Sequence, residues 1–345
     1  MSEQASGVER RGWGSPAARS AAAWLRRHGG TLRVVTTMVL ITVLLSQVSF
    51  GDLHVRLRGL ATDWPLLMIA ALLPGIGVLI SAQRWRVILA GLDKAIPMSV
   101  LVRGQLVGVF FNQLLPSTIG GDLARSWWTH RNVGSHVLSL TVVAIDRLIG
   151  LIGICAVAFV AALLSPDVVA TMPLFWLTGL IPVAVVGLLL VFAHPRTAMW
   201  GRRLLSLPGL RLVRDKVAIA YQGIAGLRSR WSRLCTALAL SIALMVEIVV
   251  LYVLIAVAFN MPVSAEALAV LVPIVSIIAM LPVTINGIGL REGALAVLGA
   301  PFGMTMADAI VLAWTVLLLQ SLYAVLGGFV YMAGRRATTE ATASR

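Results

Sequence analysis

Long apolar runs alternate with short polar stretches along most of this chain. The runs at 34–50 and 235–258 are long enough, at ~1.5 Å of helical rise per residue, to cross the ~30 Å hydrocarbon core of a bilayer. Similar runs occupy residues 65–81, 137–164, 174–193 and 306–333. Residues 51–64 are predicted to be a loop, and Pro65 suits the first position of the helix that follows it. The pattern predicts an all-α fold, a polytopic transmembrane helix bundle with six full crossings.

Polar and turn-forming residues interrupt this pattern at residues 104–119. The stretch is apolar at first but leads into Pro116, Gly120 and Gly121. A full crossing here would invert the topology of everything downstream and place the basic segment 194–234 outside the cell. We therefore predict a hairpin that enters from the cytoplasm and returns at Gly120 and Gly121.

A second interruption lies within residues 266–300, where Pro282, Gly287 and Gly289 break an apolar run. This stretch must begin and end on the outer side, either as a broken hairpin or as two complete crossings with a tight turn. Backbone groups freed by Gly and Pro are satisfied only in a protein-lined polar cavity, which favours the broken form. The bundle then has about eight membrane helices. The sequence does not decide whether each interrupted stretch is a re-entrant hairpin or crosses the membrane fully.

The composition excludes an ordinary soluble domain, because 59% of the residues are hydrophobic, 12% are charged and the mean hydropathy is +0.93. The net charge of +14 comes mainly from four segments, residues 1–33, 83–103, 194–234 and 334–345. The positive-inside rule places these segments in the cytoplasm. We therefore expect a multi-pass protein of the cell (inner) membrane with both termini cytoplasmic.

The charge pattern also defines the expected domains. They are a basic tail over 1–33, a transmembrane domain over 34–333 with an amphipathic cytoplasmic segment at 194–234, and a second tail over 334–345. Arg84 and Arg86 flank Trp85 and are expected in the cytoplasmic headgroup layer. Basic and aromatic residues do not interleave in any soluble module, so nucleic acid is not an expected partner.

Ionisable side chains at membrane depth require a partner or a function, because burying a charge in hydrocarbon costs several kcal/mol. Asp122 and Arg125 lie three residues apart at the start of a predicted helix. They fit either a helix cap with a surface ion pair or a polar pocket that they share with Asn112. In the second interpretation Arg125 presents a planar guanidinium to a lipid phosphate.

Asp146 and Arg147 are adjacent within one crossing helix, where neighbouring side chains point ~100° apart. Each therefore needs a partner on another helix. The two charges serve either in a structural ion pair between helices or in contact with a substrate, and the sequence favours neither role.

Three further charges lie in or beside apolar helices. Arg291 and Glu292 open a helix after the second interruption, where the positive helix end and a guanidinium favour an anion. Glu292 either caps this helix or pairs with Arg125 or Arg147. Glu247 is either protonated or paired with Arg147 or Arg291.

Other chemistry has no pattern in this sequence. Cys155 and Cys235 lack metal-ligand spacing, and the five histidines are scattered. Ser and Cys occur in no nucleophile motif. We therefore predict no metal site, no cofactor and no catalytic residue.

Three ordered motifs carry a resemblance to a known family. They are Gly104 with Asn112 to Pro116, Gly120, Gly121, Asp122 and Arg125; Asp146 and Arg147 with Gly150; and Pro282 to Gly287 with Gly289 and Glu292. With these motifs the chain resembles, over about residues 30–335, the flippase-like family, also described as the transmembrane region of lysylphosphatidylglycerol synthase. Asn286 departs from that pattern, which is often more Gly-rich at this point.

The resemblance implies a domain that moves a phospholipid or isoprenoid-type lipid between leaflets, or presents it to a partner enzyme. Because no soluble aminoacyltransferase domain follows residue 333, aminoacylation by this chain is not expected, and transport or lipid presentation is favoured over an enzymatic function. Two alternatives remain: a membrane-embedded lipid-modifying or lipid-linked sugar transferase with Asp122 as base, and an accessory subunit of a lipid pathway. The expected partners are membrane lipids, and the oligomeric state is left open.

Overall fold

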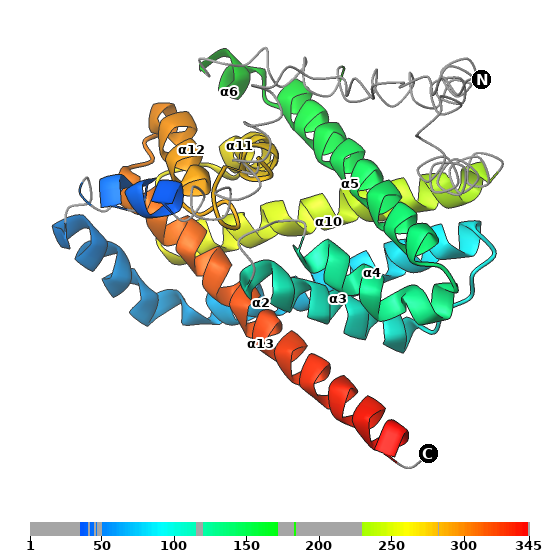
Figure 1. Cartoon of the computed structure of the whole chain (residues 1–345). Helices are drawn as coiled ribbons and strands as arrows, with labels where there is room; N and C mark the ends of the chain where they lie inside the picture. Colours follow the sequence, from blue (N-terminus) through cyan, green and yellow to red (C-terminus); the bar gives the residue numbers. More distant parts are fainter. Residues whose placement is uncertain are drawn as a thin grey trace, which may run out of the picture.

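The computed structural model describes residues 35–40, 42–44, 46, 50–114, 120–171, 183, 230–281 and 283–343. All the regular structure in these residues is helical, and they contain no strand (Figure 1). The elements are α2 (Phe50–Gly91), α3 (Met98–Leu114), α4 (Gly120–Val133), α5 (His136–Leu164), α6 (Pro166–Thr171), α10 (Trp231–Ala258), α11 (Ala265–Ala279), α12 (Leu290–Gly299), the 3-10 helix η1 (Ala300–Phe302) and α13 (Met306–Ala343). The predicted all-α polytopic bundle is confirmed.

Four of these helices are long and apolar enough to cross a membrane. The candidate spans are Asp63–Gly91, His136–Leu164, Trp231–Ala258 and Met306–Gly334. They coincide with four of the six predicted crossings. The described residues of a fifth, at 34–50, include a shorter apolar helix, Val35–Leu44. The predicted crossing at 174–193, apart from Val183, lies outside the described residues, as do the tail 1–33 and most of the segment 194–234.

Helix α2 differs from the prediction at both ends. A loop was expected over 51–64 and a helix end near Ser81, but α2 is helical from Phe50 to Gly91. The helix is interrupted at Asp63, whose φ of −113° and ψ of 22° are not helical. Pro65 follows two residues later and lacks the N–H that a continuous helix requires, which explains a kink in place of a loop.

Helices α3 and α4 form a helical hairpin at the predicted place, and its entry from the cytoplasm stays a prediction. A Cβ atom on Gly104 would lie 3.1 Å from Trp128 Cδ1, and one on Gly108 would lie 3.2 Å from the Gly121 carbonyl oxygen. These pairings run in opposite directions along the two helices, which are therefore antiparallel and closely packed. At 17 and 14 residues, both arms are shorter than the ~30 Å hydrocarbon core at ~1.5 Å per residue.

The second interruption is also a helical hairpin, of α11 and α12. Between the two helices the chain takes left-handed backbone angles at Asn286 (φ 51°), Gly287 (φ 75°) and Gly289 (φ 85°). Asn is among the few non-glycine residues that tolerate this region, so its presence in a Gly-rich turn is compatible with the geometry. The predicted break is therefore confirmed as a turn between two short helices.

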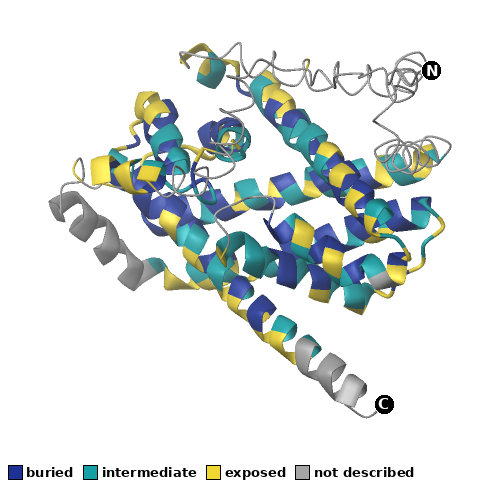
Figure 2. Ribbon diagram, viewed as in Figure 1, coloured by how far each residue is buried: buried dark blue, intermediate teal, exposed yellow. Residues whose placement is uncertain are grey.

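Burial follows the inner faces of the bundle, and exposed apolar side chains cover its outer faces (Figure 2). One apolar core joins α10, α11, α12 and α13, and a second joins α2, α3 and α5. Exposed Leu72, Leu164 and Leu318 illustrate the outer surface. Apolar side chains on the outside are expected where lipid, and not water, is the solvent. Helix α13 continues beyond the expected end at residue 333 to Ala343.

Candidate functional site

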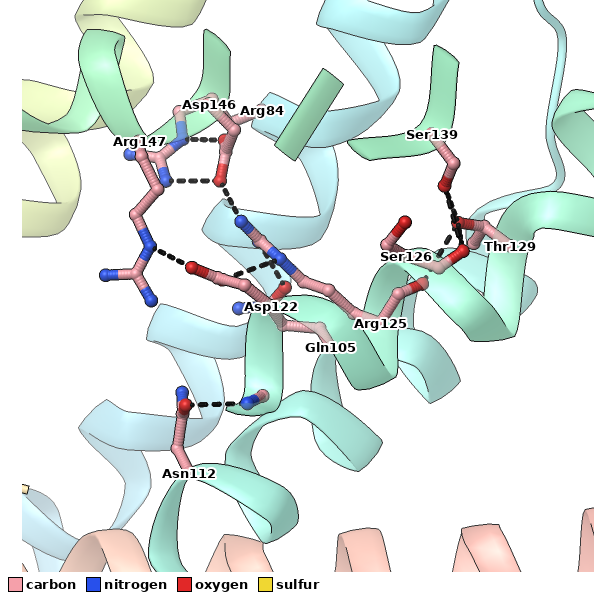
Figure 3. A network of polar contacts seen from close by, with 11 residues as sticks. Arg84, Gln105, Asn112, Asp122, Arg125, Ser126, Thr129, Ser139, Asp146 and Arg147 are labelled. Atoms are coloured by element: carbon pink, nitrogen blue, oxygen red, sulfur yellow. Dashed lines mark hydrogen bonds and ion pairs between the residues drawn. The ribbon is translucent and has the colours of Figure 1, made fainter. Parts of the chain in front are cut away.

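A cluster of charged side chains lies where α2, α4 and α5 meet (Figure 3). At its centre is Asp146 of α5, whose side chain is only 1% exposed. Arg84 of α2 donates from Nε to Asp146 Oδ1 at 2.6 Å and from Nη2 to Oδ2 at 3.1 Å. Arg125 of α4 donates from Nη2 to Asp146 Oδ2 at 2.8 Å. One carboxylate thus holds together three helices.

The position of Arg84 corrects a prediction. The headgroup layer was expected for Arg84 and Trp85, but both side chains are buried, and only Arg86 of that group is exposed. Helix α2 continues to Gly91, so Arg84 lies within the helix and faces α5. Its Nη1 also donates to Ser241 Oγ of α10 at 3.0 Å. Sequence reasoning missed this residue because the adjacent Trp and Arg resemble an interface motif.

Asp122, in the first turn of α4, links the cluster to Arg147 of α5. Its Oδ2 accepts from Arg147 Nε at 2.7 Å, and its Oδ1 lies 3.2 Å from Arg125 Nε. The predicted need of Asp146 and Arg147 for partners on other helices is therefore met in both cases. The cluster holds three guanidinium groups and two carboxylates, so it has a net positive charge.

Arg125 has the most restricted surroundings of the three arginine side chains. It is 4% exposed, its Nη1 donates to Gln105 Oε1 at 3.2 Å, and its guanidinium carbon lies 5.2 Å from the centre of the Trp85 ring. Beside it, Ser139 Oγ of α5 donates to the Ser126 carbonyl of α4 at 2.9 Å. These contacts fix α4 against α5 and exclude the surface ion pair that was one interpretation of Asp122 and Arg125.

Three adjoining cavities of about 220–230 Å³ open around the cluster. The first lies between α2, α3, α10 and α13 and contains Glu247; the second contains the charged cluster; the third reaches Arg291. Asn112 lines all three, and Arg147 lines the second and third. The predicted residues Asn112, Arg125, Arg147 and Arg291 therefore border these adjoining cavities, and the role of each there stays a prediction.

The charges on α12 have separate functions in the fold. Glu292 is 2% exposed and its Oε2 accepts from the Gly289 N–H at 2.7 Å, so it caps α12 and pairs with neither Arg125 nor Arg147. Arg291 Nη2 lies 3.4 Å from the Asn286 carbonyl oxygen, and no ion pair joins it to any described acidic residue. Arg291 thus presents a positive charge to the third cavity.

Glu247 also forms no ion pair with a described residue. It lies in α10, is 9% exposed and lines the first cavity. The two partners considered from the sequence, Arg147 and Arg291, do not bind it. The remaining alternative from the sequence, a protonated carboxyl, stays a prediction.

Glycines provide the space that the charged groups occupy. A Cβ atom on Gly150 would lie 3.3 Å from Arg84 Nη1, and one on Gly77 would lie 3.0 Å from Glu247 Oε2. At the start of α4, the Gly121 N–H donates to Asn112 Oδ1 at 3.0 Å, and a side chain on Gly121 would collide with that amide. The predicted turn residue Gly120 begins α4, whereas Pro116 and Pro282 lie outside the described residues.

A further ion pair joins the end of α2 to the start of α10, outside the candidate spans. Arg230 donates to both carboxylate oxygens of Asp93 at 2.8 Å and to the carbonyls of Ala90 and Gly91. The hydrogen bond from Arg230 holds the pKa of Asp93 below its ordinary value. This contact ties the two helix ends together at the segment predicted to be cytoplasmic.

The described residues contain no group of three or more His, Cys, Asp or Glu side chains arranged to hold a metal ion. The site is therefore characterised by arginine, carboxylate and amide groups around cavities within an apolar bundle.

Comparison with known families matches residues 30–328 to the family described as the lysylphosphatidylglycerol synthase TM region. Because the match covers most of the chain, the protein belongs to this family, as the sequence motifs indicated. A search of curated proteins found no match. The family and the apolar helices together establish a multi-pass membrane protein related to membrane lipids.

Proposed function

We propose that this member of the lysylphosphatidylglycerol synthase transmembrane-region family is a translocase that moves an anionic phospholipid or isoprenoid-type lipid between membrane leaflets. One observation carries the proposal: a largely buried arginine cluster with excess positive charge borders one cavity, and the adjoining cavity reaches Arg291, which forms no ion pair with a described residue.

The charge balance favours an anionic ligand. Two carboxylates offset two of the three guanidinium groups of the cluster, and Arg291 adds a further positive charge at the third cavity. An uncompensated charge within an apolar bundle costs several kcal/mol, and a phosphate headgroup would supply the missing negative charge. Arg147 is placed to contact it, because its side chain is 42% exposed and lines both the second and third cavities.

The two hairpins suit a transport function. The hairpins α3–α4 and α11–α12 both border the cavities, through Asn112, Arg125, Ser276 and Arg291. In the proposed topology they enter from opposite sides of the inner membrane, with both termini cytoplasmic, so that movement of one hairpin opens the cavities to one leaflet at a time. The headgroup would cross through the cavities while its chains stay in the lipid.

The alternative of a transferase with Asp122 as general base has no support from the geometry. A base needs an oxygen within hydrogen-bond reach of the substrate proton. Each oxygen of Asp122 instead faces a guanidinium nitrogen, that of Arg125 or that of Arg147. Headgroup analysis of a deletion strain separates the two functions, because a transferase predicts loss of a modified lipid and a translocase predicts altered sidedness alone.

The proposal is tested in liposomes that contain fluorescent phosphatidylglycerol in both leaflets, with a membrane-impermeant quencher added outside. The purified protein should make the inner-leaflet fluorescence accessible, and Arg291→Ala should slow this process at least tenfold. Arg291→Ala is preferred to Arg125→Ala as the first variant, because Arg291 has no ion pair whose loss would destabilise the fold. Arg86→Ala, at an exposed arginine of α2, is the matched control and should retain the wild-type rate.

Movement no faster than in protein-free liposomes, for several anionic phospholipids and an isoprenyl phosphate, would reject the translocase. Equal rates for Arg291→Ala and the wild type would reject the proposed headgroup path.

A further inference from the structure

Glu247 is a buried carboxyl group that the headgroup path does not use. It lies in the middle of the candidate span Trp231–Ala258, and only 9% of the residue is exposed. No described residue forms a hydrogen bond or ion pair with it. A carboxylate held in an apolar helix without a partner is costly, so such a group is usually functional.

The surroundings of Glu247 form a built cavity and not a packing defect. The first cavity has a volume of about 230 Å³, which is enough for several water molecules at roughly 30 Å³ each. Amide, hydroxyl and carboxyl groups line it: Ser81, Gln105, Asn112, Gln113, Glu247, Asn286, Gln320 and Tyr323. Gly77 of α2 faces the carboxylate, and a Cβ atom there would lie 3.0 Å from Oε2. The chain thus leaves room at Glu247 for water.

None of the described residues that line this cavity is a Lys, Arg or His. Besides Glu247, the titratable side chain among the described residues that line this cavity is Tyr323 of α13, whose hydroxyl donates to the Ala71 carbonyl at 2.9 Å. The charged groups from the other elements line the adjoining cavities: Arg84 of α2, Asp122 and Arg125 of α4, Asp146 and Arg147 of α5, and Arg291 of α12. The described residues of α3 and α11 that line the three cavities are uncharged.

The Glu247 cavity adjoins the proposed headgroup path. Ser81, Gln105, Asn112 and Ile248 line both the first and the second cavity. An anionic headgroup in the second cavity would therefore approach the Glu247 carboxyl through a polar region. Two like charges that share such a region repel, so the bound anion favours the protonated carboxyl. By thermodynamic reciprocity, protonation of that carboxyl strengthens anion binding by the same factor.

We propose that Glu247 is a proton-binding site that couples movement of the anionic lipid to a proton gradient, with one proton carried in the same direction as one headgroup. The proton enters from water on one side, resides on the Glu247 carboxyl while the headgroup occupies the adjoining cavity, and leaves to water on the other side. The inference rests on the proposed translocase function and adds a driving force to it.

The binding experiment uses the full chain in detergent with dihexanoyl phosphatidylglycerol as probe. Lowering the pH should strengthen binding by up to about tenfold per pH unit in the titrating range, the limit for one coupled proton. Glu247→Gln, which mimics the protonated carboxyl, should bind with the low-pH affinity at every pH. The same pH dependence in Glu247→Gln and in the wild type would overturn the proposal, as would pH-independent binding in the wild type.

The transport experiment imposes a pH gradient across proteoliposomes that contain fluorescent phosphatidylglycerol. The wild type should accumulate the lipid in the leaflet on the alkaline side, whereas Glu247→Gln should move lipid without this asymmetry. Lipid movement that ignores the gradient in the wild type overturns the coupling and leaves the translocase intact. Absence of movement in the wild type rejects the translocase itself. Repeating the assay in sodium-free choline buffer distinguishes the ion, because a requirement for sodium would overturn the assignment to protons.

Discussion

Asp146→Asn removes the negative charge that holds α2, α4 and α5 together. The carboxylate accepts three charge-assisted hydrogen bonds at 2.6, 3.1 and 2.8 Å, two from Arg84 and one from Arg125. Both arginines are at least nine-tenths buried, so the substitution leaves Arg84 without a carboxylate and Arg125 with only the 3.2 Å contact between its Nε and Asp122 Oδ1. Breaking a buried ion pair by removing one partner costs about 3–5 kcal/mol, and we expect Asp146→Asn to fall in this range.

The assay is the free energy of unfolding in mixed micelles, measured by titration with a denaturing detergent. Arg147→Ala is the matched control from the same cluster. It breaks the pair with Asp122, but the Arg147 side chain is 42% exposed, so the expected cost is below about 1 kcal/mol. A loss for Asp146→Asn no larger than that for Arg147→Ala would refute the conclusion that the pairs around Asp146 hold the helices together. A double-mutant cycle with Arg84→Gln should give a coupling of about 1–3 kcal/mol.

Three further predictions test other parts of the structure. Gly121→Ala places a methyl group against the Asn112 amide and the Gly108 carbonyl, and it should lower the free energy of unfolding by about 1–3 kcal/mol. A Cβ atom on Gly293, inside α12, meets nothing within 4 Å, so Gly293→Ala should leave the free energy of unfolding unchanged or raise it by up to about 1 kcal/mol. Unfolding measurements on the two variants check this difference. The pKa of Asp93 is lowered by its hydrogen bond with Arg230, so the pair stabilises the fold above the ordinary value of 3.8 and is lost as the pH falls through the lower folded value. The difference in melting temperature between the wild type and Asp93→Asn should therefore disappear in acid, and a constant difference from pH 6 to pH 2 would contradict it. A membrane-impermeant maleimide should label exposed Cys235 and not buried Cys155, and only from the cytoplasmic face; labelling from the outer face would invert the proposed topology.

The fold was largely predictable because membrane helices carry their signal in single segments. Apolar length alone located the spans around Asp146, Glu247 and Gln320, and the Gly and Pro residues located both hairpins. The expected loop at 51–64 was wrong because Pro65 was interpreted as the start of a helix. A proline is equally compatible with a kink in a helix that continues, and only packing against neighbouring helices decides between the two.

The site was predictable in its members but not in its pairings. Asp122, Arg125, Asp146 and Arg147 were recognisable as costly charges, and the sequence correctly indicated that Asp146 and Arg147 each needed a partner on another helix. It gave no means to identify Arg84 as the partner of Asp146, 62 residues away. That pairing depends on the rotation of α2 about its axis, which a nearly uniform apolar helix does not encode in its periodicity.

The cluster reconciles two opposing requirements of a path for anions through hydrocarbon. Bare arginines would be too costly to bury, whereas arginines fully neutralised by carboxylates would have no affinity for a phosphate. Asp146 pairs with the two most buried guanidinium groups, and Asp122 is shared between Arg125 and Arg147, the most exposed one. Arg147 and Arg291 both line the third cavity, where a ligand can reach their positive charge. Asp122→Asn should therefore strengthen binding of dihexanoyl phosphatidylglycerol, because it removes a competitor of the phosphate for Arg147. Weaker binding would show instead that Asp122 is needed to orient that guanidinium.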